Sequence, residues 1–483
     1  MKQIIALLLA LTLLLGLTGC QSTPVESTLP PTETTAPVTT EADTTPTETE
    51  PQWSPYAGTM LHYVYHYDSG RELEWEEDLL YFAQLFLDDY GPLSPFPYRV
   101  ETQNKVEYLD GHYIPEWREA FIAEINDLIL NLPQLTDADI LYRLEKMMAS
   151  MQDLHLGVEL PETKYFPLEL RAFYENEQPV FYVIGVTQVH HTLLYTKLIA
   201  INGIPIEQVI QKMEPWVCYE NSYALNAVLS SWGSYLTRVD MLTLSDVIGE
   251  NDKIVTFRFL DDSGNEVERE FHMYTGDQLS SLFWAYHGIS EVNALMSSTE
   301  FSTNYWYKIF DREDTAYIRI KQFSDAENYT LMNLGNELLQ EVRTRGSIGK
   351  VIIDLRYNPG GYRAYGYPEL INVLSRMDIG TLYVLVDDCS YSASVLTAAA
   401  IKTALPETVL VGTPAGQPPN FYAGMNYYEM PNSGYDFQIP SAWYDYMPDY
   451  PYDALMPDVV IYPTIEDYQN NVDTILEAVF AMP

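Results

Sequence analysis

Two turns in the last third of the chain have the residue types that acyl-transfer chemistry needs. The apolar strand 351–355 runs into a turn containing Gly360 and Gly361, where backbone N–H groups can approach an anionic oxygen without a Cβ in the way. The apolar strand 383–386 leads to Ser392, which directly precedes a stretch of helix-forming residues. A helix N-terminus stabilises developing negative charge. These residues therefore predict an oxyanion hole beside a nucleophilic serine.

Each turn also has a purely structural interpretation. Gly360 and Gly361 can form a simple tight turn. Ser392 can serve only as the N-cap of the following helix, a role that Ser390 or Ser394 could equally fill. Residue types alone leave both interpretations open.

The elements that must position these turns alternate between strand and helix from about residue 301. Apolar strands are expected at 316–320, 351–355, 383–386 and 408–411, and helices at 329–343 and 393–403. Apolar strands separated by helices predict an α/β fold with a mainly parallel sheet covered on both faces. Residues 301–483 are therefore expected to form one α/β core.

Two further regions precede this core. Residues 56–160 are expected to be mainly helical, with helices at 73–89, at about 116–130 and from Thr136, whose hydroxyl can cap the third helix. Residues 161–300 are expected to be rich in β-structure, with strands near 180–184 and 254–259 and a hairpin-type turn at 261–264.

The first twenty residues are predicted to be a lipoprotein signal peptide. Lys2 precedes the apolar run 4–17, which is too short to span a bilayer as a helix. Residues 17–20, Leu-Thr-Gly-Cys, resemble the bacterial lipoprotein box, in which the cysteine becomes the lipidated N-terminus. An ordinary secretory signal is the alternative. We expect a protein that is exported and lipid-anchored through Cys20 to the bacterial membrane, facing outward.

Composition predicts a disordered segment and argues against one class of binding partner. Residues 21–55 are almost all Thr, Pro, Glu, Ser and Ala, which predicts a disordered linker. The chain has 68 acidic and 26 basic residues, a formal net charge of −42, and such a field repels phosphates. Nucleic acid is therefore an improbable partner. The sequence shows no pattern that calls for a cofactor, and it does not determine the oligomeric state.

The two turns together resemble the tail-specific or C-terminal processing serine protease family. The family's signature Asp-Leu-Arg-x-Asn-x-Gly-Gly is matched by Asp354, Leu355, Arg356, Asn358, Gly360 and Gly361, and its nucleophile segment by residues 391–394. Segments 144–155 and 198–203 are similar to the family's Asp-Gly-His segment and PDZ-like module, and 410–412, 431–434 and 457–458 fit a secreted bacterial branch. The resemblance spans roughly residues 70 to 480. It implies a core of the crotonase or protease-caseinolytic type and a PDZ-like module within 161–300.

One departure from the family pattern concerns the general base. The usual lysine, about 25 residues after the nucleophile, is replaced by Gln417. Lys402 is ten residues into the helix after Ser392, about 15 Å away at 1.5 Å per residue. The branch resembling the tricorn core uses a histidine before the PDZ-like module, and His155 is the matching residue. The resemblance thus implies His155 as the base, and activity should rise through an apparent pKa of about 6 to 7.

The acid that would orient His155 stays open at this point. Asp153 is close in sequence, and Glu429 or an acid between residues 445 and 453 are the other candidates.

The other histidines point to no site. His62 and His66 have an i, i+4 spacing that suits a metal, but no third ligand is evident, so no metal is predicted. His190 and His191 are expected at the surface.

These observations predict a surface-anchored serine peptidase that cleaves peptides or unfolded protein tails. Ser392 would attack, His155 would take its proton, and the N–H groups of Gly360 or Gly361 and of Ala393 would stabilise the oxyanion. The alternative is a non-catalytic peptide-binding or scaffold lipoprotein that keeps the fold. Whether residues 161–300 capture peptide by strand addition also stays open, because the usual carboxylate-binding glycine pattern is not evident near residues 193–196.

Overall fold

The computed structural model describes residues 66–286, 304–326, 329–362 and 367–483. The predicted signal peptide, Cys20 and the predicted linker lie outside these residues. Within the described part of the chain, no helix has the length and apolar character required to cross a membrane.

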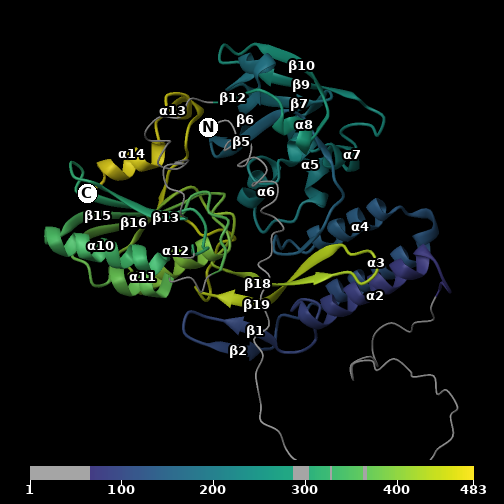
Figure 1. Cartoon of the computed structure of the whole chain (residues 1–483), viewed down its shortest axis with the longest axis horizontal. Coiled ribbons are helices and arrows are strands. Elements are labelled where there is room, and N and C mark those ends of the chain that lie inside the picture. The colour runs from purple at the N-terminus through teal and green to yellow at the C-terminus, as the bar shows by residue number, and fades with distance from the viewer. Residues whose placement is uncertain (1–65, 287–303, 327–328, 363–366) are drawn as a thin grey trace, which may run out of the picture. The chain divides into compact units, whose positions relative to one another are not determined.

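The core sheet is mainly parallel, as the alternation of strands and helices predicts (Figure 1). Its strands, in spatial order, are β13 (Tyr305–Phe310), β14 (Thr315–Ile320), β15 (Ile348–Asp354), β16 (Ile379–Val386), β17 (Val409–Gly412) and β20 (Val459–Val460). Neighbours from β14 to β20 pair in parallel, and β13 pairs with β14 antiparallel. The four expected strands are confirmed.

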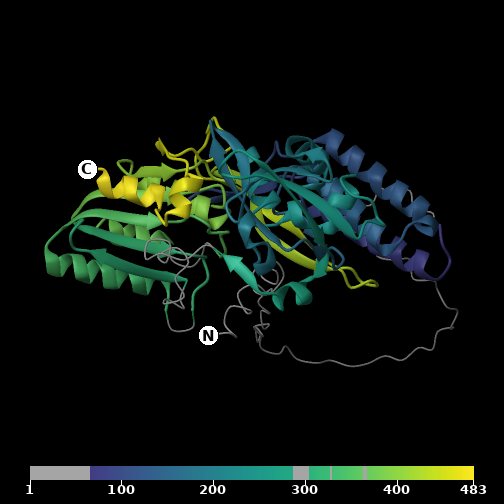
Figure 2. The ribbon, with the colours of Figure 1, turned by 90° about the horizontal axis from the view of Figure 1, so that it is seen from above.

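Helices cover both faces of this sheet. Figure 2 shows α10 (Leu331–Arg345) on one side of the strands and α14 (Thr474–Ala481) on the other. Alternate residues of β15 divide accordingly, because Val351 and Ile353 pack with α10 while Ile352 packs with α14. Two more helices, α11 (Tyr367–Leu374) and α12 (Ala393–Ala404), contribute to the α10 side. The expected two-sided covering is confirmed.

The helices before residue 160 also match their sequence signals. They are α2 (Arg71–Asp89), α3 (Pro115–Asn131) and α4 (Asp137–Ala149). Thr136 caps α4 through a capping box, in which its hydroxyl accepts from the Asp139 N–H and the Asp139 carboxylate accepts from the Thr136 N–H.

A five-stranded sheet that the sequence did not predict joins this region to the last part of the chain. It combines β1 (Tyr98–Glu101), β2 (Val106–Leu109) and β3 (Gly157–Val158) with the long hairpin of β18 (Asn420–Glu429) and β19 (Asp436–Asp445). Strand β1 pairs with β19 in parallel, and β3 pairs with β19 antiparallel (Figure 1). Because β3 begins two residues after His155, this pairing brings His155 to the core.

The remaining region forms an antiparallel sheet with short helices. Its strands are β5 (Leu168–Glu175), β6 (Gln178–Thr187), β7 (Lys197–Ile201), β8 (Ile204–Pro205), β9 (Ile254–Leu260), β10 (Glu266–His272) and β12 (Trp284–Tyr286). A two-stranded sheet pairs β4 (Lys164–Tyr165) with β11 (Tyr274–Thr275). The expected strands fall within β6 and β9, and the turn between β9 and β10 closes where predicted, with Gly264 at φ +80°.

Short helices complete the described part of the chain. They are α5 (Ile206–Met213), α6 (Ser222–Leu229), α7 (Val239–Leu244), α8 (Gly276–Ser280) and α13 (Ile465–Gln469), with single turns of 3-10 helix at 132–134, 214–216 and 235–237 and a kinked 3-10 segment at 188–193.

Candidate active site

Ser392 stands between β16 and α12 in a conformation that few serines adopt. Its φ is 55° and its ψ is −122°, and its side chain makes no capping hydrogen bond to α12. The hydroxyl lies instead 3.1 Å from Nε2 of His155. A strained backbone of this kind costs free energy, and it is found where the surrounding structure imposes it, often at functional sites. The interpretation of Ser392 as an N-cap alone is therefore wrong.

The two neighbouring serines fix the turn rather than line the site. Ser390 and Ser394 are fully buried, and both hydroxyls donate to the carbonyl oxygen of Leu355, at 2.9 and 3.4 Å. They join the turn between β16 and Ser392 (residues 387–392), hereafter the nucleophile turn, to the end of β15.

His155 is buried, with 3% of its surface exposed. Its backbone N–H donates to Asp153 Oδ1 at 2.9 Å. Its ring stacks with Tyr391, with centroids 4.8 Å apart, and with Phe421 on β18, with centroids 5.6 Å apart. These two aromatic contacts hold the imidazole in place while Nε2 lies 3.1 Å from the Ser392 hydroxyl.

The other imidazole nitrogen faces a polar group of residues. The Tyr391 hydroxyl lies 3.1 Å from Nδ1 and Gln417 Nε2 lies 3.4 Å from it. Among the acids of the described chain, those within 4.0 Å of this nitrogen are Asp153, at 3.7 Å, and Glu220, at 3.9 Å. The structure thus brings two carboxylates to the side of the ring opposite Ser392.

Glu429, one of the acids that the sequence left open, makes no ion pair with His155. Glu429 lies eight residues beyond Phe421 on β18, about 27 Å away at 3.4 Å per residue. The described acids between residues 445 and 453 make no ion pair with His155 either.

Glu220 is the residue that sequence reasoning missed. It lies between the 3-10 turn 214–216 and α6, in a stretch with no recognisable motif. Its Oε1 accepts hydrogen bonds from the Tyr391 hydroxyl and, at 2.7 Å, from Gln417 Nε2. Burial raises the pKa of Glu220 well above its ordinary value and the nearby Asp153 raises it further, while the hydrogen bonds from Tyr391 and Gln417 lower it.

Gln417, at the place of the family's usual lysine, does lie at the site. Its Oε1 accepts from the backbone N–H of Ser392 at 2.8 Å, while its amide nitrogen donates to Glu220. Lys402 is occupied elsewhere, because its ammonium donates to the Thr408 carbonyl oxygen at 2.6 Å and to Asp458 at 2.9 Å. An amide can hold the nucleophile turn in place, but it cannot accept the serine proton usefully.

The turn that contains Gly360 and Gly361, hereafter the glycine turn, packs directly against the nucleophile turn. Gly360 has φ +98°, and a Cβ there would lie 2.6 Å from Ser392 Cβ. Gly361 has φ +122°, and a Cβ there would lie 2.3 Å from the carbonyl oxygen of Phe323. Both positions therefore require glycine because of what packs against them. A simple tight turn without such contacts would not have this requirement.

The N–H groups of this turn are not equivalent. Gly360 N–H donates to Asn358 Oδ1 at 2.8 Å. The N–H groups of Gly361 and Ala393 have no hydrogen-bond partner within the described residues. Of the predicted oxyanion donors, these two are the ones available to a ligand.

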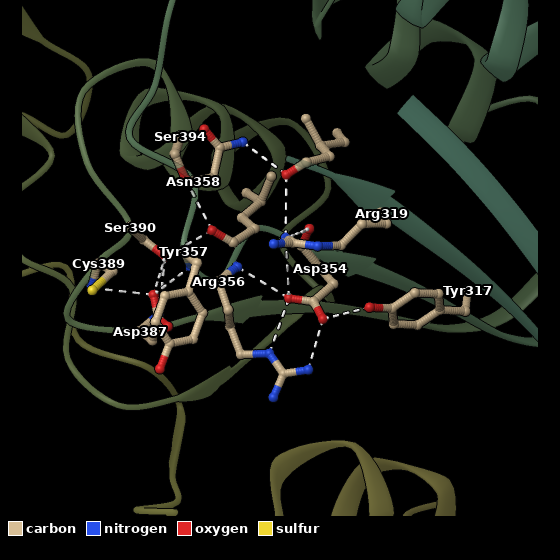
Figure 3. Close-up of polar contacts among 12 residues, drawn as sticks. Tyr317, Arg319, Asp354, Arg356, Tyr357, Asn358, Asp387, Cys389, Ser390 and Ser394 are labelled. Atoms are coloured by element: carbon tan, nitrogen blue, oxygen red, sulfur yellow. Dashed lines mark hydrogen bonds and ion pairs between the residues drawn. The ribbon is translucent and has the colours of Figure 1, made fainter. Parts of the chain in front are cut away.

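A network of buried ion pairs and hydrogen bonds lies at the end of β15, where the chain enters the glycine turn (Figure 3). Asp354, at the end of β15, accepts from Tyr317 at 2.6 Å and from the Arg356 guanidinium at 2.7 and 3.0 Å. Burial by itself would raise the pKa of Asp354, but Arg356 and Arg319 outweigh it and lower the pKa to about 2. Arg356 also pairs with Asp473 at 2.7 Å, so both buried charges are compensated.

Asp387 joins the glycine turn to the nucleophile turn. Its Oδ1 accepts from the backbone N–H groups of Tyr357, at 2.9 Å, and Cys389, at 3.2 Å, and lies 3.1 Å from the Ser390 hydroxyl (Figure 3). One carboxylate oxygen therefore sets the spacing of the two turns, which the sequence had identified only separately.

Among the described residues, Asp153, His155 and Glu220 form the group whose spacing could suit a metal ion, since one ligand atom of each lies within 4.8 Å of the others. These atoms already have protein partners, because Asp153 Oδ1 accepts from the His155 N–H and Glu220 Oε1 accepts from Tyr391 and Gln417. The arrangement of the imidazole between a serine hydroxyl and a buried acid suits proton transfer.

Comparison with known proteins supports the fold. No protein-family model and no curated protein matches the sequence. The crystal structure of mature CPAF has a TM-score of 0.55 with this chain at 11% identity, covering 85% of this chain and 96% of its own. Mature CPAF complexed with lactacystin has a TM-score of 0.53 at 11% identity, covering 83% and 96%.

The fold is similar to that of mature CPAF. A further structure, the photosystem II D1 C-terminal processing protease, covers 86% of this chain and 97% of its own at 12% identity, with a TM-score of 0.40, at which no shared fold is inferred. The chain shares its mixed α/β fold with the two structures of mature CPAF.

Proposed function

We propose that this protein is a serine peptidase in which Ser392 is the nucleophile and His155 the general base. The observation that carries the proposal is the 3.1 Å contact between Ser392 Oγ and His155 Nε2, made by residues 237 positions apart in the chain. A serine hydroxyl is a poor nucleophile near neutral pH and needs a positioned acceptor for its proton. A hydroxyl, an imidazole and free N–H groups beside them supply what acyl transfer requires.

In this proposal the N–H groups of Gly361 and Ala393 stabilise the oxyanion. The free N–H groups and the packing of the glycine turn on Ser392 support that role. Ala393 is the first residue of α12, so its N–H also carries the partial positive charge of a helix N-terminus.

The finer architecture belongs to the same proposal. We infer that the core is of the crotonase or protease-caseinolytic type and that residues 161–300 form a PDZ-like module. We also propose that the substrates are peptides or unfolded protein tails. The protein would act outside the cell, anchored to the bacterial membrane by a lipid on Cys20, with residues 21–55 as its tether.

A fluorophosphonate probe tests the proposal. Such a probe reacts only with an activated serine, so the wild-type protein should be labelled and Ser392→Ala should not. A matched control is Ser324→Ala, a serine outside both turns, which should be labelled like the wild type. Labelling that survives in Ser392→Ala would show that another residue is the nucleophile.

The alternative, a non-catalytic peptide-binding lipoprotein, makes a different prediction. Wild-type protein that is folded by circular dichroism but unreactive with the probe would favour this alternative. Digestion of a peptide library by the purified ectodomain would then show no cleavage, while peptide binding persists.

A further inference from the structure

Tyr391 stands between the imidazole of His155 and the carboxylate of Glu220. Its hydroxyl lies 3.1 Å from His155 Nδ1 and also donates to Glu220 Oε1. A phenol has one proton, so a hydroxyl that donates to the carboxylate can only accept from the ring. Gln417 Nε2 can only donate, but it lies farther from Nδ1, at 3.4 Å, and donates to Glu220 at 2.7 Å. The shorter Tyr391 contact therefore favours a hydrogen on Nδ1, which leaves Nε2, the nitrogen that faces Ser392, with its lone pair.

We propose that Tyr391 and Glu220 are positioning residues, which hold His155 in the tautomer that accepts the serine proton and stabilise the imidazolium that results. This inference rests on the proposed function, since it assigns roles within the same site. It differs from a direct contact between histidine and carboxylate, because the Glu220 carboxylate acts on the ring through the Tyr391 hydroxyl.

The contacts of the two nearby acids distinguish their roles. Asp153 Oδ1 accepts from the backbone N–H of His155 at 2.9 Å, and Asp153 Oδ2 accepts from the Tyr90 hydroxyl at 3.2 Å. Asp153 therefore fixes the main chain that carries His155 and makes no hydrogen bond to the ring. Glu220 is connected to the ring nitrogen through the shared Tyr391 hydroxyl.

The proton balance shows when Glu220 would act. As Ser392 Oγ bonds to the substrate carbonyl carbon, the hydroxyl proton passes to Nε2 and the ring becomes a cation. The proton then passes to the leaving nitrogen as the carbon–nitrogen bond breaks. Water attacks the ester, its proton passes to Nε2, and that proton returns to Oγ as the acid product leaves. The Nδ1 hydrogen stays on the ring throughout, so Tyr391 and Glu220 stabilise charge without taking a proton.

The surroundings of Glu220 favour this role. Its side chain is 10% exposed, and Oε2 has no hydrogen-bond partner within the described residues. The titratable groups that face it are Asp153, His155, Cys218 and Tyr391. No Lys or Arg of the described residues contributes to the electrostatics of Glu220, so the imidazolium of His155 is the cation that would stabilise its ionised form.

Two variants test whether Glu220 acts on His155 through the Tyr391 hydroxyl, an arrangement we call the relay. Tyr391→Phe removes only the hydroxyl and keeps the ring that stacks on His155, and Glu220→Gln removes only the charge. Matched controls are Tyr142→Phe, which loses a 3.0 Å hydrogen bond to Asp240, and Glu145→Gln, which neutralises another buried glutamate. The controls should keep wild-type reactivity.

The first measurement is the rate of fluorophosphonate labelling at Ser392 as a function of pH. Tyr391→Phe and Glu220→Gln should each label about tenfold to a hundredfold more slowly, and the double variant should be no slower than the worse single variant. In Glu220→Gln the pH range over which the labelling rate rises should move to lower pH, because loss of an anion disfavours the imidazolium. Wild-type rates and an unmoved pH range in both variants would overturn the proposal.

The second measurement does not depend on activity. In a titration of protein with ¹³C-labelled histidine, the His155 signal is assigned by its loss in His155→Ala. Its midpoint should fall in both Glu220→Gln and Tyr391→Phe and stay unchanged in Glu145→Gln. A wild-type protein that the probe does not label would refute the proposed function, while the midpoints would still decide the relay. An unchanged midpoint in Glu220→Gln would refute the relay alone.

Discussion

Gly360 and Ser392 are packed so closely that a Cβ at Gly360 would lie 2.6 Å from Ser392 Cβ and 2.9 Å from the backbone nitrogen of Ala393. The hydrogen bond from the Tyr391 N–H to the Asn358 carbonyl oxygen, at 3.0 Å, joins the same two turns. The backbone of the glycine turn therefore packs against Ser392 and restricts its position.

We expect Gly360→Ala to reduce probe labelling and peptide cleavage by about a hundredfold, since a displacement of about 1 Å at a catalytic group has this effect. The added methyl group must displace Ser392 or the Ala393 N–H, and alanine also strains a φ of +98°. Gly264→Ala is the control, because it has φ +80° with open space around it. Equal activity of Gly360→Ala and Gly264→Ala would contradict the packing argument.

His155→Ala and Lys402→Ala compare the proposed base with the last lysine in the sequence. The first variant should lose a hundredfold or more in turnover, because no acceptor for the serine proton remains. Lys402→Ala should keep near wild-type turnover and lose at most about 1 kcal/mol of stability, since its ion pair with Asp458 is partly exposed. Steady-state kinetics on a cleaved peptide measures both. Full activity in His155→Ala would exclude the mechanism.

Gln417→Met tests whether the buried amide holds the nucleophile turn. The methionine has a similar volume, but it leaves the Ser392 N–H without its 2.8 Å acceptor and removes one of the two side-chain donors to Glu220 Oε1. We expect a loss of about 2 kcal/mol in the free energy of unfolding and a drop of about tenfold or more in labelling rate. Urea denaturation gives the first quantity. Gln84→Met, which loses a partly buried bond to Asp88, should change it by less than about 1 kcal/mol. A Gln417→Met protein as stable as the wild type would contradict the assignment.

Asp388 should make the protein less stable as pH rises. Burial, together with the neighbouring Asp387, raises the pKa of Asp388 to about 7. Between about pH 4 and 7 the unfolded chain is ionised at this carboxyl while the folded protein keeps the proton, so stability falls by about 1.4 kcal/mol per pH unit from this group. Below and above this window the group contributes no slope.

Asp388→Asn removes that slope. Urea denaturation at pH 5 and pH 8 should therefore show the variant gaining about 2 to 3 kcal/mol relative to the wild type as pH rises. Parallel pH dependences of the two proteins would show that Asp388 is ionised in the folded state throughout.

Much of the fold was predictable because its signals are local. Strand 351–355, the helix that begins after Ser392 and the cap at Thr136 each depend on residues within a few positions of one another. Apolar runs specify buried parallel strands, and a capping residue with an acid three positions later specifies a helix start.

The hairpin of β18 and β19 was not predictable in the same way. Along β18 the first residues are buried while the last residues are largely exposed, so its pattern does not report a single buried face. Its pairing with β1 and β3 joins residues more than 270 positions apart, and such a register depends on which surfaces meet in the folded chain.

The amino-acid sequence by itself determined the nucleophile turn, the glycine turn and a histidine in a segment similar to a known family's. Only the tertiary structure decided that Ser392 and His155 touch, that Asp387 spaces the two turns, and that Glu220 rather than Glu429 lies behind the imidazole. The reason is physical. Local residue preferences act over a few positions, whereas a buried carboxylate is selected by which distant segments the core, the sheet and the aromatic stack bring together.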